Sequence, residues 1–123
     1  MTRILLLEDN ADMLTMMAQM LEWGDYEVIV GRNGREGVQV LTTADELPDV
    51  VICDLLMPEM DGLAFLDTVR SHAEWSQLPF IMMSAHSSPQ ERQAAIEHGA
   101  NDFLVKPFNL EDFHQVLARW EGP

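Results

Sequence analysis

The chain alternates short apolar runs with longer segments in which apolar residues recur at helical spacing. Its four clearest apolar runs are each followed by polar residues of a chemically reactive type. These are residues 4–7 before Glu8 and Asp9, residues 50–53 before Asp54, residues 80–83 before Ser84, and residues 103–105 before Lys106. Short apolar runs separated by helix-length segments are typical of buried parallel strands connected by crossover helices.

Five strand–helix pairs follow from this pattern. The expected strands span residues 3–7, 26–30, 49–53, 79–83 and 101–105. The expected helices span residues 10–23, 34–41, 63–72 (after a loop over 57–62), 89–98 and, after a cap at Asn109, 110–120. Ser88 and Asn109 are typical helix N-caps, and Gly24 and Gly99 are typical of helix ends. The pattern predicts an α/β protein with a doubly wound five-stranded parallel sheet, (βα)5, in a single domain over residues 1–123.

The polar residues after the apolar runs predict one site. All strands of a parallel sheet point the same way, so the residues at their carboxyl ends meet at one edge of the sheet. The carboxylates of Glu8, Asp9 and Asp54 would repel one another there unless a cation lay between them. Hard oxygen ligands suit Mg²⁺, and the sequence has no His or Cys cluster that would favour a transition metal. Lys106, the single lysine of the chain, would bring an ammonium group to the same edge.

The amino-acid composition limits the kinds of partner that this protein is expected to bind. Seven basic residues stand against 21 acidic ones, which gives a formal net charge of -14. A field of this sign repels phosphate backbones, so direct nucleic-acid binding is not expected, whereas divalent cations and basic protein surfaces are attracted. No apolar stretch approaches the ~20 residues that span a bilayer, and no signal peptide is evident. These features predict a cytoplasmic protein without membrane contact, in which Cys53 is a buried thiol.

Four motifs carry a resemblance to a known family. They are Leu-Leu-Leu-Glu-Asp at residues 5–9, Cys-Asp-Leu-Leu-Met-Pro at 53–58 with Asp-Gly at 61–62, Met-Ser-Ala at 83–85, and Gly-Ala at 99–100 through Asp-Phe-Leu-Val-Lys-Pro-Phe at 102–108. Through them, nearly all of the chain resembles the receiver domain of bacterial two-component response regulators. The resemblance implies a flavodoxin-like fold. It also implies that Asp54 accepts a phosphoryl group from a phosphohistidine of a sensor histidine kinase or phosphotransfer protein.

The resemblance also implies a metal site. Asp9, the Asp54 side chain and the Leu56 backbone carbonyl would bind Mg²⁺, with Mn²⁺ as a substitute, and Glu8 would act through a bound water. The domain would then be a signalling module rather than an enzyme, catalysing only its own phosphorylation and dephosphorylation.

Three further residues would contact or report the phosphoryl group. The resemblance implies that Lys106 pairs with its oxygens and that Ser84 donates a hydrogen bond to one of them. Neutralising charge on the transferred group is where phosphoryl-transfer catalysis mainly comes from. Phe103 is either a core residue or the switch aromatic of the family. As a switch it would remodel the face formed by the fourth helix, fifth strand and fifth helix, and so control a partner protein or an output domain.

Two residues are expected to set the lifetime of the phosphorylated form. Leu56 and His86 should lie nearest the path of the hydrolytic water. Leu56 cannot orient a water and can only shield the phosphoryl group, whereas His86 can hydrogen-bond and titrates near neutral pH. Shielding should dominate, which predicts a long-lived phosphorylated form.

Three other classes of protein share parts of this pattern. A haloacid-dehalogenase-like phosphohydrolase needs an Asp two residues after its nucleophile, where this chain has Leu56. A flavodoxin-like carrier would bring a flavin phosphate to the loop where Glu8 and Asp9 would repel it. A pseudo-receiver would lack some of the site residues, and none is missing here.

Two features of the helices also lead to expectations. The four methionines Met13, Met16, Met17 and Met20 follow i, i+3, i+4, i+7 spacing and predict the buried stripe of the first helix. The alternative is a docking surface, because the resemblance places the docking of phosphodonor helices at the top of this helix and methionine side chains adapt to such contacts. The symmetric dimer of DNA-binding family members uses paired basic and acidic residues. Asp102 and Glu111 match the acidic side, but this chain has Leu110 where a basic residue is common and no lysine in the fourth helix. That dimer is therefore not expected, and the oligomeric state stays open.

Overall fold

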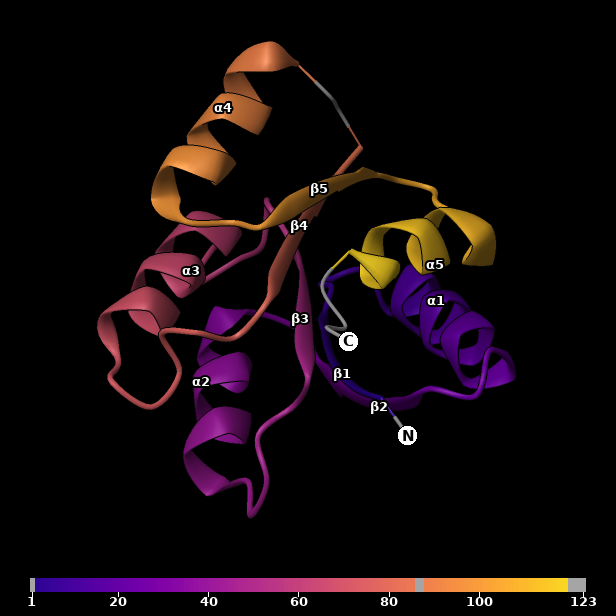
Figure 1. Ribbon diagram of the computed structural model, residues 1–123, viewed down its shortest axis with the longest axis horizontal. Coiled ribbons are helices and arrows are strands. Elements are labelled where there is room, and N and C mark those ends of the chain that lie inside the picture. The colour runs from indigo at the N-terminus through magenta and orange to yellow at the C-terminus, as the bar shows by residue number, and fades with distance from the viewer. Residues whose placement is uncertain (1, 86–87, 120–123) are drawn as a thin grey trace.

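The computed structural model describes residues 2–85 and 88–119, in which strands and helices alternate along the chain (Figure 1). The strands are β1 Arg3–Leu7, β2 Glu27–Gly31, β3 Val50–Asp54, β4 Phe80–Ser84 and β5 Asp102–Val105. The helices are α1 Ala11–Trp23, α2 Gly34–Thr43, α3 Gly62–Ser71, α4 Pro89–His98 and α5 Leu110–Ala118. Among the described residues, no helix combines the length and apolar character needed to cross a membrane.

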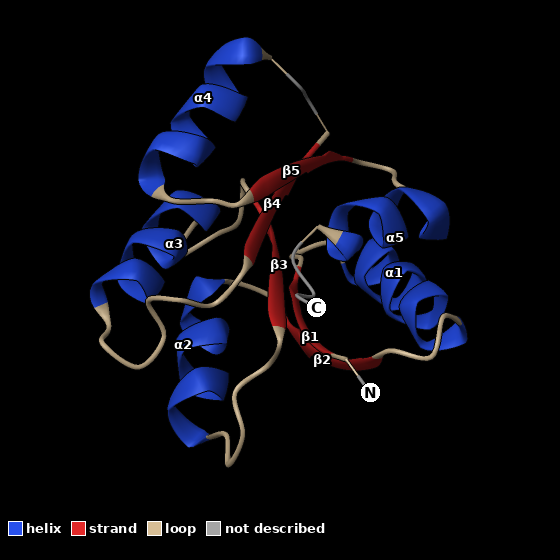
Figure 2. Ribbon diagram, in the orientation of Figure 1, coloured by secondary structure: helices blue, strands red, loops and turns tan. Residues whose placement is uncertain are grey.

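The strands form one parallel sheet in the order β2-β1-β3-β4-β5. Helices α1 and α5 cover one face, and α2, α3 and α4 lie on the other (Figure 2). The predicted doubly wound (βα)5 architecture is therefore confirmed. Because all strands are parallel, the residues that follow each of them gather at one edge.

The apolar runs form strands because both of their faces are covered. Successive residues of a strand point to opposite faces. In β1, Leu5 and Leu7 join the hydrophobic cluster beneath α2 and α3, whereas Ile4 and Leu6 join the cluster beneath α1 and α5. All four side chains are fully buried, so the run is continuously apolar rather than alternating.

The observed elements lie close to the predicted ones. Asn10, Ser88 and Asn109 are N-caps whose side chains accept backbone hydrogen bonds, and Gly99 ends α4 with a left-handed φ of 112°. Strands β3 and β4 each extend one residue further than predicted, so Asp54 and Ser84 are the last residues of their strands. The backbone position of each of these two residues is thus set by its strand.

The methionine stripe of α1 is not the buried face. Met17 is buried, but Met16 is 52% exposed, and the buried residues of the helix are Leu14, Met17 and Leu21. Two stripes of helical spacing share Met17, and the periodicity alone does not distinguish them. The packing of α1 against the sheet selects the stripe that contains the two leucines.

Candidate functional site

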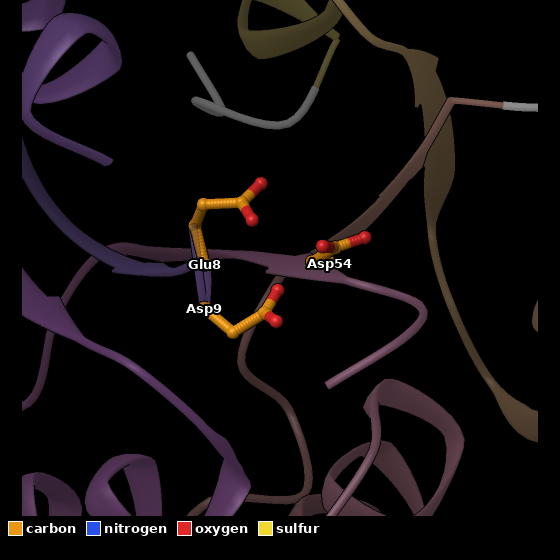
Figure 3. Close-up of side chains that lie close together, drawn as sticks. All are labelled: Glu8, Asp9 and Asp54. Carbon is orange, nitrogen blue, oxygen red and sulfur yellow. The ribbon is translucent and has the colours of Figure 1, made fainter. Parts of the chain in front are cut away.

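Three carboxylates converge at the carboxyl edge of the sheet (Figure 3). Glu8 and Asp9 directly follow β1, and Asp54 ends β3. These strands are neighbours, with Leu7 opposite Cys53, so the register brings Glu8 beside Asp54. One carboxylate oxygen from each of the three acidic residues lies within 4.8 Å of the others.

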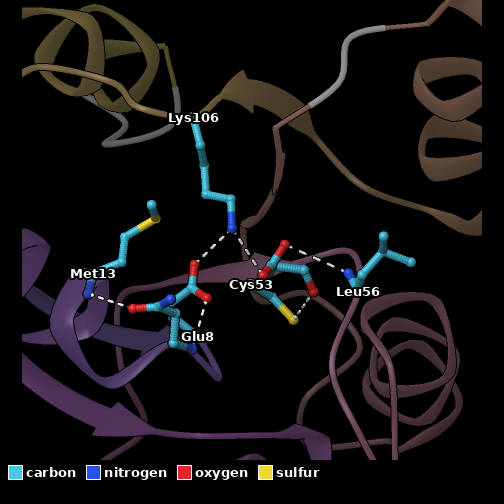
Figure 4. A network of polar contacts seen from close by, with 7 residues as sticks. Glu8, Met13, Cys53, Leu56 and Lys106 are labelled. Atoms are coloured by element: carbon cyan, nitrogen blue, oxygen red, sulfur yellow. Dashed lines mark hydrogen bonds and ion pairs between the residues drawn. The ribbon is translucent and has the colours of Figure 1, made fainter.

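Burial makes two of these carboxylates costly unless they are compensated. Glu8 is 1% exposed and Asp54 is 5% exposed, whereas Asp9 faces solvent. The ammonium of Lys106 donates to Glu8 Oε1 at 2.8 Å and to Asp54 Oδ2 at 2.9 Å (Figure 4). The other oxygen of Glu8 accepts from the Asn10 backbone N–H at 3.0 Å. A single cation from the end of β5 thus compensates both buried acids.

Lys106 remains an ammonium in this setting. Burial lowers its pKa, but the hydrogen bonds and charges of Glu8 and Asp54 outweigh that effect and raise the pKa above its ordinary value of 10.5. Three carboxylates face this one ammonium, so the cluster keeps an excess of negative charge. An additional cation is the natural complement of such a cluster.

Ser84 lies at the same edge, between the strands that carry Asp54 and Lys106. It ends β4 and is 2% exposed. Its carbonyl oxygen accepts a hydrogen bond of 2.8 Å from the Lys106 N–H, and its neighbour Met83 is in register with Asp54. The structure therefore gathers Glu8, Asp9, Asp54, Ser84 and Lys106 at one edge of the sheet.

The remaining predicted residues lie around this centre. Leu56, two residues beyond Asp54, is 65% exposed, and its N–H donates to Asp54 Oδ1 at 3.4 Å. Phe103 is buried within β5. The predicted role of His86 falls on a residue outside the described ranges.

Two features of the surroundings complete the site. Cys53 is fully buried, as predicted, and burial, together with the charges of nearby acids, raises the pKa of its thiol well above the ordinary value. The guanidinium of Arg92 lies over the Phe103 ring, 5.4 Å from its centroid. Sequence reasoning missed this contact, because nothing local in the sequence shows which residue of α4 faces β5.

The donor set fits a hard divalent cation. The group that could hold a metal among the described residues, Glu8, Asp9 and Asp54, offers carboxylate oxygens and no nitrogen or sulfur. Oxygen-only sites with a few carboxylates suit Mg²⁺, which usually keeps several waters, better than a transition metal. The exposed Asp9 leaves one side of the cluster open to solvent.

The family to which the chain belongs is the response regulator receiver domain, whose model matches residues 4–118. Receiver domains are signalling domains rather than classical enzymes, and they bind Mg²⁺ at an acidic site. The predicted family and fold are therefore confirmed.

Two curated relatives show how the chain compares with whole regulators. It is 35% identical over 117 residues to the response regulator MprA of Mycolicibacterium vanbaalenii and 33% identical over 109 residues to the transcriptional regulatory protein CpxR of Escherichia coli. The matches cover 95% and 89% of this chain but 48% and 44% of those proteins. The chain thus spans about half the length of these relatives.

Solved structures agree with the fold. The chemotaxis protein CheY4 of Vibrio cholerae superposes with a TM-score of 0.89 at 32% identity, covering 98% of both chains. The receiver domain of the sensor histidine kinase PA1611 of Pseudomonas aeruginosa has a TM-score of 0.87 at 28% identity, covering 97% of this chain and 96% of that one. The PA1611 structure contains a magnesium ion coordinated in its active site cleft.

Proposed function

We propose that residues 1–123 form a single receiver domain that accepts a phosphoryl group on Asp54. The observation that carries the proposal is the Lys106 ammonium, which contacts both Asp54 and Glu8 at the edge where Asp9 stays exposed. A carboxylate oxygen of Asp54 attacks the phosphorus of a phosphohistidine. The P–N bond breaks, its electron pair stays on the imidazole nitrogen, and an aspartyl phosphate forms.

The metal ligands are proposed from the same geometry. Asp9, Asp54 and the backbone carbonyl of Leu56 would hold Mg²⁺, or Mn²⁺ in its place. Both carboxylate oxygens of Glu8 already accept hydrogen bonds, one from Lys106 and one from Asn10, which supports its action through a water rather than directly. When bound, the ion neutralises negative charge on the phosphoryl oxygens.

The protein's own groups then stabilise the product. The Lys106 N–H donors, which contact Asp54 before transfer, turn to the phosphoryl oxygens, and the Ser84 hydroxyl donates to one of them. Phosphorylation adds about −1.5 to −2 charge and new acceptor oxygens, which pull Ser84 and the loop after β4 toward Asp54. Phe103 then leaves its place under Arg92, and the face formed by α4, β5 and α5 changes.

The proposed partners follow from this chemistry. A sensor histidine kinase or a phosphotransfer protein donates the phosphoryl group in the cytoplasm, and the changed face controls an output domain or an effector protein. Asp102, on the acidic side of the family's symmetric dimer, is here paired with Arg119 of the same chain at 2.6 Å. We propose that this internal pairing, together with Leu110, disfavours the symmetric dimer.

The lifetime of the phosphorylated form is proposed to depend on Leu56 and His86. Leu56 is exposed beside Asp54 and offers no polar atom in its side chain to a hydrolytic water. Replacing it by Asn should speed dephosphorylation about tenfold to a hundredfold, the usual scale of positioning effects. His86→Ala should change the pH dependence of the rate between about pH 6 and 8. A Leu56→Asn variant that loses phosphate at the wild-type rate would show that another residue limits water access.

The proposal is tested with a small phosphodonor. Acetyl phosphate and Mg²⁺ should add one phosphoryl group to the wild-type chain, measured by intact mass. Asp54→Asn should not be phosphorylated, because the attacking carboxylate is gone. Asp9→Asn should bind Mg²⁺ weakly and be phosphorylated poorly, whereas Glu8→Gln should be milder. Equal phosphorylation of Asp54→Asn and wild type would refute the assignment.

A further inference from the structure

The loop between β3 and α3, residues 55–61, is attached to β4 at its first residue and closed by a hydrogen bond between its two ends. The Leu55 N–H donates to the Met83 carbonyl at 2.8 Å, and the Gly62 N–H donates to the Leu55 carbonyl at 2.9 Å. This β3–α3 loop carries Leu56, whose carbonyl is the proposed neutral ligand of the metal. The attachments hold the ends of the loop, whereas the path of residues 56–60 between them needs its own supports.

The start of α2 provides those supports. Asn33 Nδ2 donates to Glu59 Oε2 at 3.1 Å, and Arg35 forms an ion pair with the other Glu59 oxygen at 3.1 Å. The Gly34 N–H donates to the Met60 carbonyl at 3.0 Å. The three consecutive residues 33–35 at the start of α2 thus contact residues 59 and 60 of the loop. The two segments are about 26 positions apart in the chain.

The approach of the two segments is close. A Cβ on Gly34 would come within 2.5 Å of Met60 Cγ and 2.8 Å of the Met60 carbonyl oxygen, so only glycine allows this contact. Glu59 has a φ of 64°, in the left-handed region that favours glycine. A non-glycine residue keeps such a conformation only where its surroundings hold it there. Here a backbone hydrogen bond from the Met60 N–H to the Pro58 carbonyl at 2.7 Å spans Glu59, and its side chain contacts Asn33 and Arg35.

The contact also borders the metal ligands. Asn33 and Pro58 line a cavity of about 250 Å³ together with Asp9, Arg32 and Glu36. Pro58 belongs to the β3–α3 loop, two residues beyond Leu56 and one before Glu59. A shift of the loop at Glu59 therefore moves a segment that contains Leu56 and that lines the same cavity as the proposed metal ligand Asp9.

We propose that Asn33 and Glu59 are positioning residues for the metal site. Their hydrogen bond holds the β3–α3 loop against α2 and so keeps the Leu56 carbonyl directed toward the ion held by Asp9 and Asp54. The inference rests on the proposed function, because it concerns the Mg²⁺ ligands named there. Neither residue touches the ion or the phosphoryl group.

The two polar atoms of Asn33 have separate partners, which allows a clean test. Its Oδ1 accepts the Glu36 N–H at 3.0 Å and caps α2, whereas its Nδ2 contacts Glu59. Asn33→Asp keeps the cap, since Asn and Asp cap equally well. The same change removes the donor and places a carboxylate against the carboxylate of Glu59. It breaks the contact with the loop and leaves the helix start intact.

The experiment measures Mg²⁺ affinity of the unphosphorylated chain by calorimetry. Asn33→Asp should bind Mg²⁺ about tenfold more weakly, in the range seen when supports of metal ligands are lost. Charge alone predicts the opposite, because the variant adds a negative charge beside a cation site. Glu59→Gln keeps an acceptor oxygen for Asn33 and should bind nearly as wild type. The double variant N33D/E59Q restores a donor–acceptor pair with reversed roles and should recover the affinity.

Each outcome of these measurements supports or overturns the positioning role of Asn33 and Glu59. Apo thermal unfolding in EDTA should be similar for wild type and Asn33→Asp, which separates positioning from general stability. Unchanged or tighter Mg²⁺ binding by Asn33→Asp, or no recovery in N33D/E59Q, overturns the inference while the proposed function stands. Absence of Mg²⁺ binding in the wild type refutes the proposed metal site itself. If Asn33→Asp does not fold, Glu59→Gly, whose φ suits glycine, should fold and bind more weakly than the distant charge control Glu46→Gln.

Discussion

Helices α4 and α5 precede and follow β5 on opposite faces of the sheet, and they are attached to it in different ways (Figure 1). Helix α5 buries Phe113, Val116 and Leu117, and the Phe113 ring packs edge-on against Tyr26 with 5.2 Å between centroids. Helix α4, of similar length, has Ala95 as its buried residue, and its Ile96 is 51% exposed. An apolar face holds α5, whereas α4 has almost none.

Polar contacts around its C-terminal end hold α4 to the rest of the molecule instead. Ser88 caps its start, and Arg70 binds the chain just after its end, donating to the Gly99 carbonyl at 3.0 Å and to Asn101 Oδ1 at 2.9 Å. The last residue of the helix, His98, contacts Asp67 of α3 at 2.7 Å. The C-terminal end of α4 is thus firmly attached to the α3 side of the molecule.

This difference in packing indicates which of the two helices can move at the lower cost in free energy. Segments with few buried apolar contacts open at low free energy, and moving elements are drawn from them. Between its capped start and its attached end, α4 meets β5 through Arg92, which covers the Phe103 ring. Movement of α4 exposes little apolar surface, whereas movement of α5 would expose Phe113. We therefore expect α4 to move more than α5 when the face formed by α4, β5 and α5 changes.

The largest expected effect is on the free energy of unfolding, and it tests the apolar packing that holds α5 to the sheet. Phe113→Ala should lower the free energy of unfolding by about 3–5 kcal/mol, because it leaves a cavity in a fully buried position. Ile96→Ala in α4 should change it by less than about 0.5 kcal/mol, as exposed substitutions usually do. Urea unfolding of both variants measures the contrast. Comparable losses would show that α4 is held by its apolar face after all.

The second effect on stability tests the hydrogen bonds by which Arg70 holds the chain after α4. Arg70→Met keeps most of the aliphatic stem but removes the donors to Gly99, Asn101, Leu78 and Ser76. The loss of these hydrogen bonds to part-buried acceptors should lower the free energy of unfolding by about 2–3 kcal/mol, although Asn101 Oδ1 keeps its bond from the Phe80 N–H. Amide hydrogen exchange should speed up in residues 89–101 more than in α5. The control Arg32→Met, at an exposed position, should be close to neutral, and equal losses in both variants would contradict the role of Arg70.

A smaller effect concerns the response itself. After phosphorylation of Asp54, amide protection should change in α4 and β5 and stay nearly constant in α5. Local shifts of about 1 kcal/mol in opening free energy are the expected scale, since coupling energies between sites are typically of this size. Hydrogen exchange with mass spectrometry measures this on the wild type and on the Asp54→Asn control. Unchanged protection across residues 88–105 would contradict the proposed switch.

The smallest effect is a pH dependence at Lys106, which lies where β5 turns from α4 toward α5. Its folded-state pKa is raised by Glu8 and Asp54, despite burial, above the value of the unfolded chain. The stabilisation from these contacts is therefore complete below about pH 10.4, the unfolded pKa, and is lost as pH rises through the folded pKa. Lys106→Met should lack this alkaline dependence in urea unfolding. Parallel stability curves for both proteins above that pH would contradict it.

Much of the fold and of the candidate site could be predicted from the sequence because the relevant signals are local. The apolar runs are long enough and close enough to continuous to indicate strands buried on both faces. Parallel connection then requires their ends to meet at one edge, whichever way the helices pack. Glu8, Asp54 and Lys106 could therefore be grouped from the pattern alone, although their hydrogen bonds could not. The register of β1 against β3 places Glu8 beside Asp54, and Lys106 reaches both from the end of β5.

The remaining features depend on contacts between residues far apart in the chain. The stripe of α1 that is buried, Leu14, Met17 and Leu21 rather than the methionines, was decided by packing against the sheet. Arg70 finds partners up to 31 positions away, and Asn33 reaches Glu59 across 26. Side chains of this kind have no periodicity that marks them in a sequence. Their roles exist only once the sheet has brought separate loops and helix ends within hydrogen-bonding distance, because these attractions act over a few ångströms.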